Sequence, residues 1–123
     1  MYDDSMVLCG SSAYEKKYYF NDDFDALPQQ VKDELKILCV LFTEDVGGVL
    51  TLEFDDEGNL LLNTSAEEED VLYDDIGSGL KIKQMQKEKA ELFRSLELFY
   101  KVFFLGMDAD EAAGKHEESG QEN

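Results

Sequence analysis

The side chains that could perform acid–base or nucleophilic chemistry are few and far apart along this chain. His116 is the single imidazole, and it lies in an acidic stretch where nothing would hold a general base within reach of a substrate. Cys9 and Cys39 have no C-x-x-C spacing and no further ligands for a zinc site. We interpret Cys39 as a small buried hydrophobe in an apolar helix and Cys9 as a free thiol. These residues predict no catalytic group and no metal site.

Two glycine-containing stretches could be mistaken for phosphate-binding loops. Gly47-Gly48 and Gly77-Ser78-Gly79 lack both the Walker lysine and the dinucleotide-binding fingerprint. Asp74 and Asp75 precede the second stretch and would repel a phosphate group. Carboxylates are abundant, but none lies in a pattern that would separate two pKa values in a dry cleft. The sequence therefore predicts a protein that is not an enzyme and holds no cofactor.

Charge is the strongest compositional signal. The chain has 29 acidic and 11 basic residues in 123 positions, a formal net charge of −18. This charge repels nucleic-acid backbones and anionic lipid surfaces, and it speeds encounters with basic proteins. No apolar run has the roughly 18 residues of a membrane span, and Met1-Tyr2-Asp3-Asp4 lacks the basic start of a secretory signal. We therefore expect a cytoplasmic protein whose partner is a protein, not nucleic acid or a membrane.

The densest acidic patch is a candidate face for a basic partner. It allows two interpretations: a solvated linker that leads into the acidic first turn of a helix, or a site for a basic peptide or a weakly held cation. We expect the intervening apolar residues, Val71 to Tyr73 and Ile76, to fold back onto the core. The acidic residues of the patch are Glu67, Glu68, Glu69, Asp70, Asp74 and Asp75.

Hydrophobic periodicity predicts the elements that must position this patch. Aromatic residues favour a strand over 14–20, and a stripe at helical spacing predicts a helix from near Leu27 to Gly47. Alternation on both sides of Gly58 predicts a β-hairpin over 49–62. A calcium loop beginning at Glu53 is the competing interpretation, but it needs a bidentate Glu where this chain has Thr64. A long helix is predicted over 78–105, with a start nearer residue 74 as an alternative.

This order predicts an α+β fold, in which two helices pack on one face of a small antiparallel sheet of three strands. We expect residues 1–13 to be a flexible arm, 14–106 a single domain and 107–123 a disordered acidic tail. The predicted core residues are Leu50, Leu52, Phe54, Leu60 and Leu62 from the hairpin, together with Val31, Leu35, Leu38, Phe42, Leu92, Leu96 and Phe99 from the helices.

The end of the long helix differs from the rest because it is apolar on nearly every side. A helix of this kind must be buried on more than one face. Either the N-terminal arm covers the extra surface or a second copy of the chain does, and the latter would make a homodimer. The residues predicted for self-association are Leu98, Phe99, Tyr100, Val102, Phe103 and Phe104.

Three stretches of the chain resemble a family of small uncharacterised proteins from anaerobic Firmicutes. They are Tyr14–Phe20, Leu38–Leu52 and Tyr100–Gly106, so the resemblance spans about residues 14–106. It implies a bacterial cytosolic origin. It implies no activity, substrate or site, and it transfers no functional residue.

The leading prediction from these observations is a non-catalytic, acidic protein-interaction module that self-associates through the aromatic end of its last helix. The alternative is a binder of a small ligand or a divalent cation. Such a binder would use the acidic patch at 67–75 or a pocket between the helices and the sheet.

Overall fold

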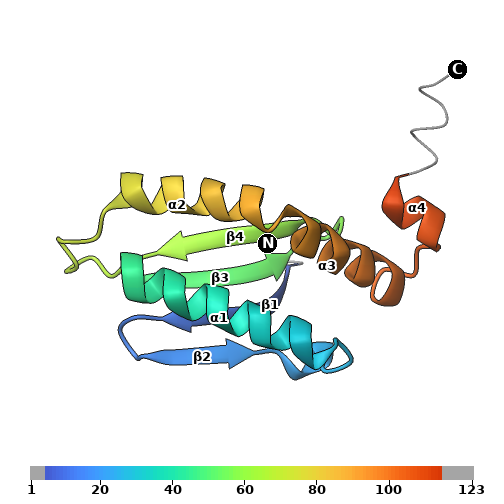
Figure 1. Ribbon diagram of the computed structural model, residues 1–123, viewed down its shortest axis with the longest axis horizontal. Helices are drawn as coiled ribbons and strands as arrows, with labels where there is room; N and C mark the ends of the chain where they lie inside the picture. Colours follow the sequence, from blue (N-terminus) through green and yellow to red (C-terminus); the bar gives the residue numbers. More distant parts are fainter. Residues whose placement is uncertain (1–4, 115–123) are drawn as a thin grey trace, which may run out of the picture.

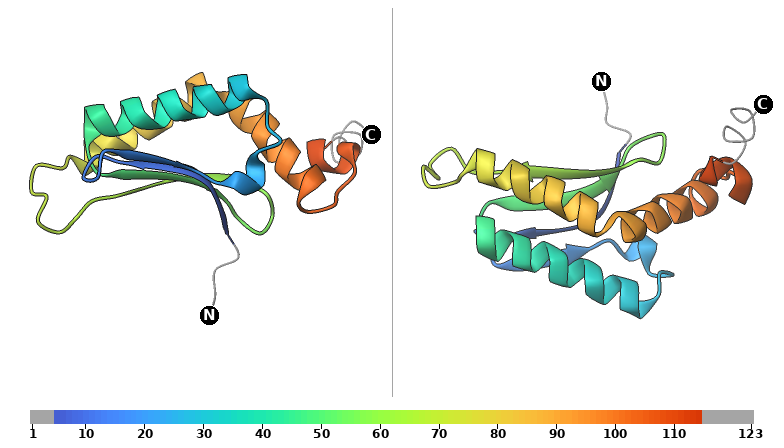
Figure 2. Two further views of the ribbon diagram at one scale, coloured as in Figure 1. Left: turned by 90° about the horizontal axis from the view of Figure 1, so that it is seen from below. Right: turned by 45° about the horizontal axis from the view of Figure 1, so that its top comes forward.

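Four antiparallel strands in the order β2-β1-β3-β4 make the sheet of this protein, whose computed structural model describes residues 5–114 (Figure 1). The strands are β1 (Met6–Ser12), β2 (Lys17–Phe20), β3 (Val49–Phe54) and β4 (Leu60–Ser65). The helices are η1 (Asp22–Phe24, a 3-10 turn), α1 (Gln29–Val46), α2 (Asp75–Glu88), α3 (Ala90–Phe103) and α4 (Ala109–Ala113). In Figure 2, α1 and α2 lie over one face of the sheet, and α3 continues past the β3–β4 turn. The α+β class is confirmed, but the predicted count of three strands is wrong.

The missing strand is β1, which occupies most of the stretch predicted to be a flexible arm. It pairs with β2 on one side and with β3 on the other, so it lies inside the sheet. A bulge between Val7 and Cys9 shifts the register, and Leu8 and Cys9 are both fully buried although they are adjacent. A bulge of this kind breaks the alternation by which a strand is recognised in a sequence. Asn21 stabilises the bulge, because its side chain donates to the Val7 carbonyl at 2.7 Å and its backbone N–H donates to the Leu8 carbonyl at 2.9 Å.

The first helix and the hairpin form as the sequence predicts. α1 begins after Pro28 and ends at Gly47, whose N–H donates to the Thr43 carbonyl and whose φ is +86°. Strands β3 and β4 pair from Val49–Ser65 to Phe54–Leu60, so the hairpin is confirmed and the calcium-loop interpretation is wrong. Gly58 has φ +89° in the turn, and a Cβ atom there would lie 2.6 Å from Cγ of Lys101. Glycine is therefore required at this position for both conformation and space.

The predicted long helix is broken at Lys89 into α2 and α3. Lys89 has φ −110° and ψ 25°, outside helical geometry, and its ammonium group forms an ion pair with Glu34 of α1 at 2.8 Å. The alternative start near residue 74 is confirmed, because Asp74 caps α2 by accepting from the Gly77 N–H. In α3, Phe93, Leu96 and Tyr100 are buried, whereas Phe103 is 72 % exposed.

The stretch predicted to be a disordered tail contains α4 in its described part. Asp108 and Glu111 form a reciprocal capping box at the start of this helix, and Ala112 is buried where α4 packs against α3. The predictions for residues 1–4 and 115–123, which include His116, lie outside the described residues.

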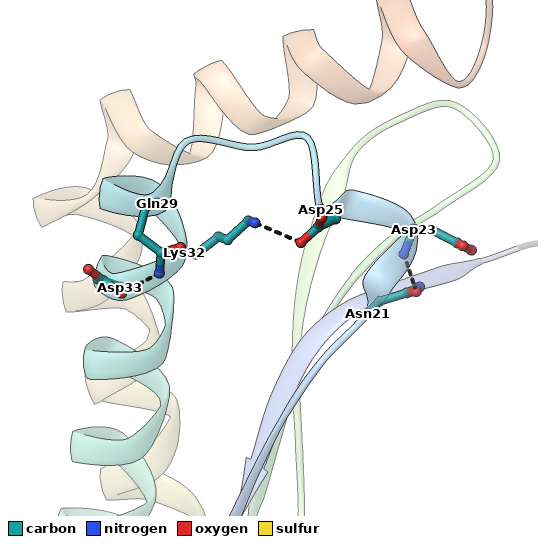
Figure 3. Close-up of polar contacts among 6 residues, drawn as sticks. All are labelled: Asn21, Asp23, Asp25, Gln29, Lys32 and Asp33. Carbon is teal, nitrogen blue, oxygen red and sulfur yellow. Dashed lines mark hydrogen bonds and ion pairs between the residues drawn. The ribbon is translucent and has the colours of Figure 1, made fainter.

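The segment between β2 and α1 brings an aromatic side chain into the core. Asn21 accepts from the Asp23 N–H and starts η1 (Figure 3). Phe24 of this turn is fully buried. Lys32 of α1 forms an ion pair with Asp25 at 2.8 Å, which ties the segment to the helix. The Phe24 ring contacts the rings of Phe54, Phe99, Tyr100 and Phe104, and the predicted core residues all belong to the same cluster.

Candidate functional site

The acidic patch forms a loop between β4 and α2, residues 66–74, which we call the acidic loop. Figure 1 shows it projecting beyond one end of the sheet, opposite to the β3–β4 turn. Glu67, Glu68 and Glu69 are all exposed, while Asp70 is partly buried. The exposed carboxylates have no ion-pair partner among residues 5–114 and face solvent together. The loop therefore presents uncompensated negative charge.

The first half of the acidic loop is anchored by Tyr14, from the turn between β1 and β2. The Tyr14 hydroxyl donates to Oδ2 of Asp70 at 2.6 Å and accepts from the Glu67 N–H at 3.0 Å. The hydrogen bond to the Asp70 carboxylate raises the pKa of Tyr14 above its ordinary value, because ionisation would place two negative charges together. The Asp70 carboxylate therefore accepts a hydrogen bond within the protein, and it is less available to a basic partner than the prediction assumed.

The second half of the acidic loop is anchored by Tyr73. Its hydroxyl donates to the Ser78 hydroxyl of α2 at 2.6 Å. Its ring covers Gly48, where a Cβ atom would lie 2.7 Å from the ring. Ser78 is buried in the first turns of α2, so the Gly77-Ser78-Gly79 stretch is helical and forms no phosphate loop. Both ends of the acidic loop are therefore held by tyrosine side chains.

Apolar side chains lie in water between these two anchors. Val71 is 86 % exposed and Leu72 is 91 % exposed, and Ile76 and Leu80 of α2 are also exposed. The prediction that Val71 to Tyr73 and Ile76 fold back onto the core is wrong except for Tyr73, which packs on Gly48. Val71 and Leu72 lie between the two tyrosine anchors, which hold the backbone there in a turn. The backbone of this segment forms only local turns, with hydrogen bonds such as Asp70 N–H to the Glu67 carbonyl. The sequence contains no signal for these turns, so its apolar residues look like core residues.

Two of the predicted acidic residues act in α2 itself. Asp74 is its N-cap and Asp75 is in its first turn, where the N–H groups and the helix dipole favour negative charge. Asp75 stays exposed beside Ile76, so it contributes to the surface of the acidic loop as well. Lys81, further along α2, forms an ion pair with Asp45 of α1 at 2.6 Å and so does not neutralise the loop.

The structure divides the residues predicted for self-association into core and surface. Tyr100 is 5 % exposed and stacks on Phe54 with ring centroids 4.3 Å apart, so it belongs to the core. Phe99 and Phe104 are partly buried against the same aromatic cluster, and Val102 is also partly buried. Only Leu98, at 36 %, and Phe103, at 72 %, are exposed. Phe24 and α4 cover much of the surface that the sequence leaves to an arm or a second copy.

The two cysteines are brought together although they lie far apart in the chain. Their Sγ atoms are 3.8 Å apart between β1 and α1, and both side chains are fully buried as free thiols. The contact with Cys9, together with burial, raises the pKa of Cys39. Cys39 is the buried thiol that the sequence predicts, but Cys9 is not in a mobile arm. Within residues 5–114, no three His, Cys, Asp or Glu side chains are arranged to hold a metal ion.

These features define a small two-layer α+β domain with one projecting acidic loop. The chain belongs to a family of unknown function, DUF6145, whose model matches residues 5–108. The match includes β1, which the resemblance noted in the sequence leaves out. No curated protein and no solved structure matches the chain. None of the helices in the described range is long and apolar enough to cross a membrane.

Proposed function

We propose that this protein is a non-catalytic interaction module of the cytoplasm, and that its acidic loop binds a basic segment of another protein. The observation that carries the proposal is the exposure of Val71 and Leu72, 86 % and 91 %, next to three exposed glutamates. The bacterial origin implied by the resemblance is part of the same proposal.

Burial of the exposed apolar side chains, Val71 and Leu72, would favour binding of a partner. Burying a Val or Leu side chain against a partner contributes about 1.5–3 kcal/mol relative to leaving it in water. Because Tyr14 and Tyr73 hold both ends of the acidic loop, less conformational entropy is lost on binding than for a free segment. The acidic loop therefore combines apolar contact area with partial preorganisation.

Charge selects the kind of partner. Glu67, Glu68 and Glu69 favour lysine or arginine residues that flank the apolar contact, and the net charge of −18 increases the rate of encounter with such a segment. The same charge disfavours nucleic acid and anionic membranes. The proposed partner segment is basic and contains two or more apolar residues.

Two other predicted functions, cation binding at the acidic patch and self-association through α3, have less support from the geometry. A divalent cation needs several converging oxygen ligands, whereas Asp70 and Asp74 already accept hydrogen bonds within the protein. Self-association through α3 would depend on Leu98 and Phe103, and stable dimers bury about 800 Å² on each partner. We therefore base the proposal on the acidic loop and not on the end of α3.

Selection of short random peptides on the immobilised protein tests the proposal. We expect enriched peptides that contain lysine or arginine around apolar residues, and whose affinity, measured by fluorescence anisotropy, falls with added salt. Val71→Ser/Leu72→Ser should weaken their binding at least tenfold, because the burial of each side chain is worth more than the roughly 1.4 kcal/mol of a tenfold change. Glu67→Gln/Glu68→Gln/Glu69→Gln should weaken binding and reduce its salt dependence.

Matched control variants test whether binding depends on the acidic loop itself or only on net negative charge and exposed apolar surface. Asp56→Asn/Glu57→Gln/Glu91→Gln removes the same charge at exposed positions outside the loop, and Phe103→Ser removes an exposed apolar residue. Neither should change peptide affinity. If no peptide is enriched, or if the control variants weaken binding as much as the loop variants do, the proposal is wrong.

A further inference from the structure

A cavity of about 600 Å³ lies between β2, the turn that precedes it, and the adjacent side of α1. It is lined by Ser11, Lys16, Lys17 and Tyr18 from the first two strands and their turn, and by Lys36 and Thr43 from α1. Its volume is in the range of about 300–1,000 Å³ that small-molecule sites occupy. We call it the lysine cavity.

Positive charge gathers at the lysine cavity in a chain where acidic residues greatly outnumber basic ones. Three of the eleven basic residues line it, and Glu44 is the one carboxylate among the lining residues. Within residues 5–114, the ion pairs engage Lys32, Lys81 and Lys89, and none engages Lys16, Lys17 or Lys36. Lys32, one turn before Lys36 on α1, points to Asp25 (Figure 3). All three lysines are exposed, so the lysine cavity is bordered by ammonium-bearing side chains that form no ion pair within the described residues.

The inner wall of the lysine cavity is polar and rigid. The Ser11 hydroxyl, 6 % exposed, donates to the Cys39 carbonyl at 2.8 Å and lies 3.0 Å from the Thr43 hydroxyl. The Tyr18 hydroxyl is buried beside the Cys9 thiol, and burial together with this neighbour raises the pKa of Tyr18.

The turn that carries two of these lysines has a strained backbone. Lys16 has φ +55° and is the one non-glycine residue in residues 5–114 with positive φ. A lysine in this conformation costs about 1 kcal/mol or more, and glycine or asparagine would be more stable there. A lysine at a position that favours glycine or asparagine is consistent with a role for its side chain.

We propose that the lysine cavity binds a small phosphorylated metabolite. Ammonium groups suit the charge and the oxygens of a phosphate, and Val40, Ala13 and the Tyr18 ring supply an apolar wall for the organic part of the molecule. The overall charge of −18 repels extended polyanions, whereas a small anion interacts mainly with the local cluster of lysines. None of the acidic-loop residues lines the lysine cavity, so this proposal does not depend on the proposed partner segment.

Thermal shift at constant ionic strength tests the proposal with ribose 5-phosphate, glucose 6-phosphate and pyrophosphate as probes. A ligand that binds only the folded state raises the melting temperature. We expect at least one phosphorylated probe to do so, while ribose and glucose do not. Citrate distinguishes the phosphate group from carboxylates, and a response to citrate alone would overturn the assignment. The absence of any response up to about 10 mM, above most metabolite affinities, would also overturn it.

Variants then locate the site. Lys16→Asn/Lys36→Gln should lower the affinity for the responding probe at least tenfold. Asparagine is chosen at residue 16 because it tolerates the left-handed backbone there. Lys83→Gln/Lys87→Gln, at exposed positions of α2, removes the same charge and should leave the affinity unchanged. Equal losses in the two lysine double variants would show nonspecific charge attraction and overturn the proposal.

Discussion

Tyr100 and Phe103 lie one turn apart near the end of α3 and have opposite environments. Tyr100 is 5 % exposed and stacks on Phe54, whereas Phe103 is 72 % exposed and contacts Phe99 with ring centroids 4.8 Å apart. Both are aromatic residues in an apolar run, so residue type does not distinguish them. At the residue scale, burial decides which of them stabilises the fold.

Alanine substitutions at these two positions should therefore differ in their effect on the free energy of unfolding. Tyr100→Ala leaves a cavity beside Phe54 and Phe24, and we expect a loss of about 3–5 kcal/mol. Phe103→Ala should change stability by less than about 0.5 kcal/mol. Urea denaturation followed by circular dichroism measures both. Similar losses would contradict the assignment of Tyr100 to the core and Phe103 to the surface.

Asp55, in the β3–β4 turn, makes a pH-dependent contribution to the stability of the folded protein. Slight burial acts to raise its pKa, but hydrogen bonds from Asn59 and from the Glu57 N–H outweigh burial and hold the pKa below its ordinary value. A carboxylate with a lowered pKa in the folded state stabilises the protein above its unfolded pKa, and this contribution is lost as the pH falls through the folded value.

We therefore expect Asp55→Ala to lower stability at pH 7 by about 1 kcal/mol, the size of a typical hydrogen-bond contribution. The difference from the unsubstituted protein should narrow as the pH falls from 7 toward 3. Thermal melts across this range measure it, with Asp56→Ala in the same turn as the control. A difference that is constant with pH would contradict the role of the ionised carboxylate.

The acidic loop depends on contacts between elements that are far apart in the sequence. Tyr14 of the β1–β2 turn reaches Asp70, and Tyr73 packs on Gly48 at the end of α1. The same kind of contact accompanies the break between α2 and α3, where Lys89 meets Glu34 of α1. At the element scale, the positions of loop and helix are therefore determined by side chains of other elements.

Removing the Tyr14 hydroxyl should loosen the acidic loop without unfolding the protein. Tyr14→Phe loses the hydrogen bonds to Asp70 and from the Glu67 N–H, so the backbone near Glu67 opens more often. A protease that cleaves after glutamate should cut at Glu67–Glu69 several times faster in this variant. Tyr19→Phe, at an exposed position of β2, is the control and should leave the rate unchanged. Equal rates in both variants would mean that Tyr14 does not anchor the loop.

At the scale of the whole molecule, β1 joins the two halves of the sheet. It pairs with β2 and β3 and contributes Leu8 and Cys9 to the core that α1 covers. A protein of this size has few alternative contacts to replace an interior strand.

Deletion of residues 1–12 should therefore abolish cooperative unfolding, although these residues look like a dispensable arm in the sequence. Circular dichroism and thermal denaturation would report the loss of a folded state. Deletion of residues 1–4, which precede β1, is the control and should keep the transition. If the longer deletion melted as cooperatively as the control does, the interior position of β1 would be wrong.

The regular parts of the fold could be predicted because local signals agree there. The stripe of α1, its glycine end and the alternation around Gly58 each follow a single period, so α1 and the hairpin come directly from the sequence. The strand β1 could not be predicted, since its bulge buries adjacent residues and Gly10, Ser11 and Ser12 carry little strand preference.

For the candidate sites, the sequence by itself determined the charge of the chain, the acidic patch between hairpin and helix, and the scarcity of catalytic residues. Only the tertiary structure decided that Val71 and Leu72 face water, that Cys9 meets Cys39 and that three lysines line one cavity. The reason is physical: composition and periodicity are properties of neighbouring residues. Exposure, pairing and cavities depend on contacts between residues tens of positions apart, which exist only once the chain has folded.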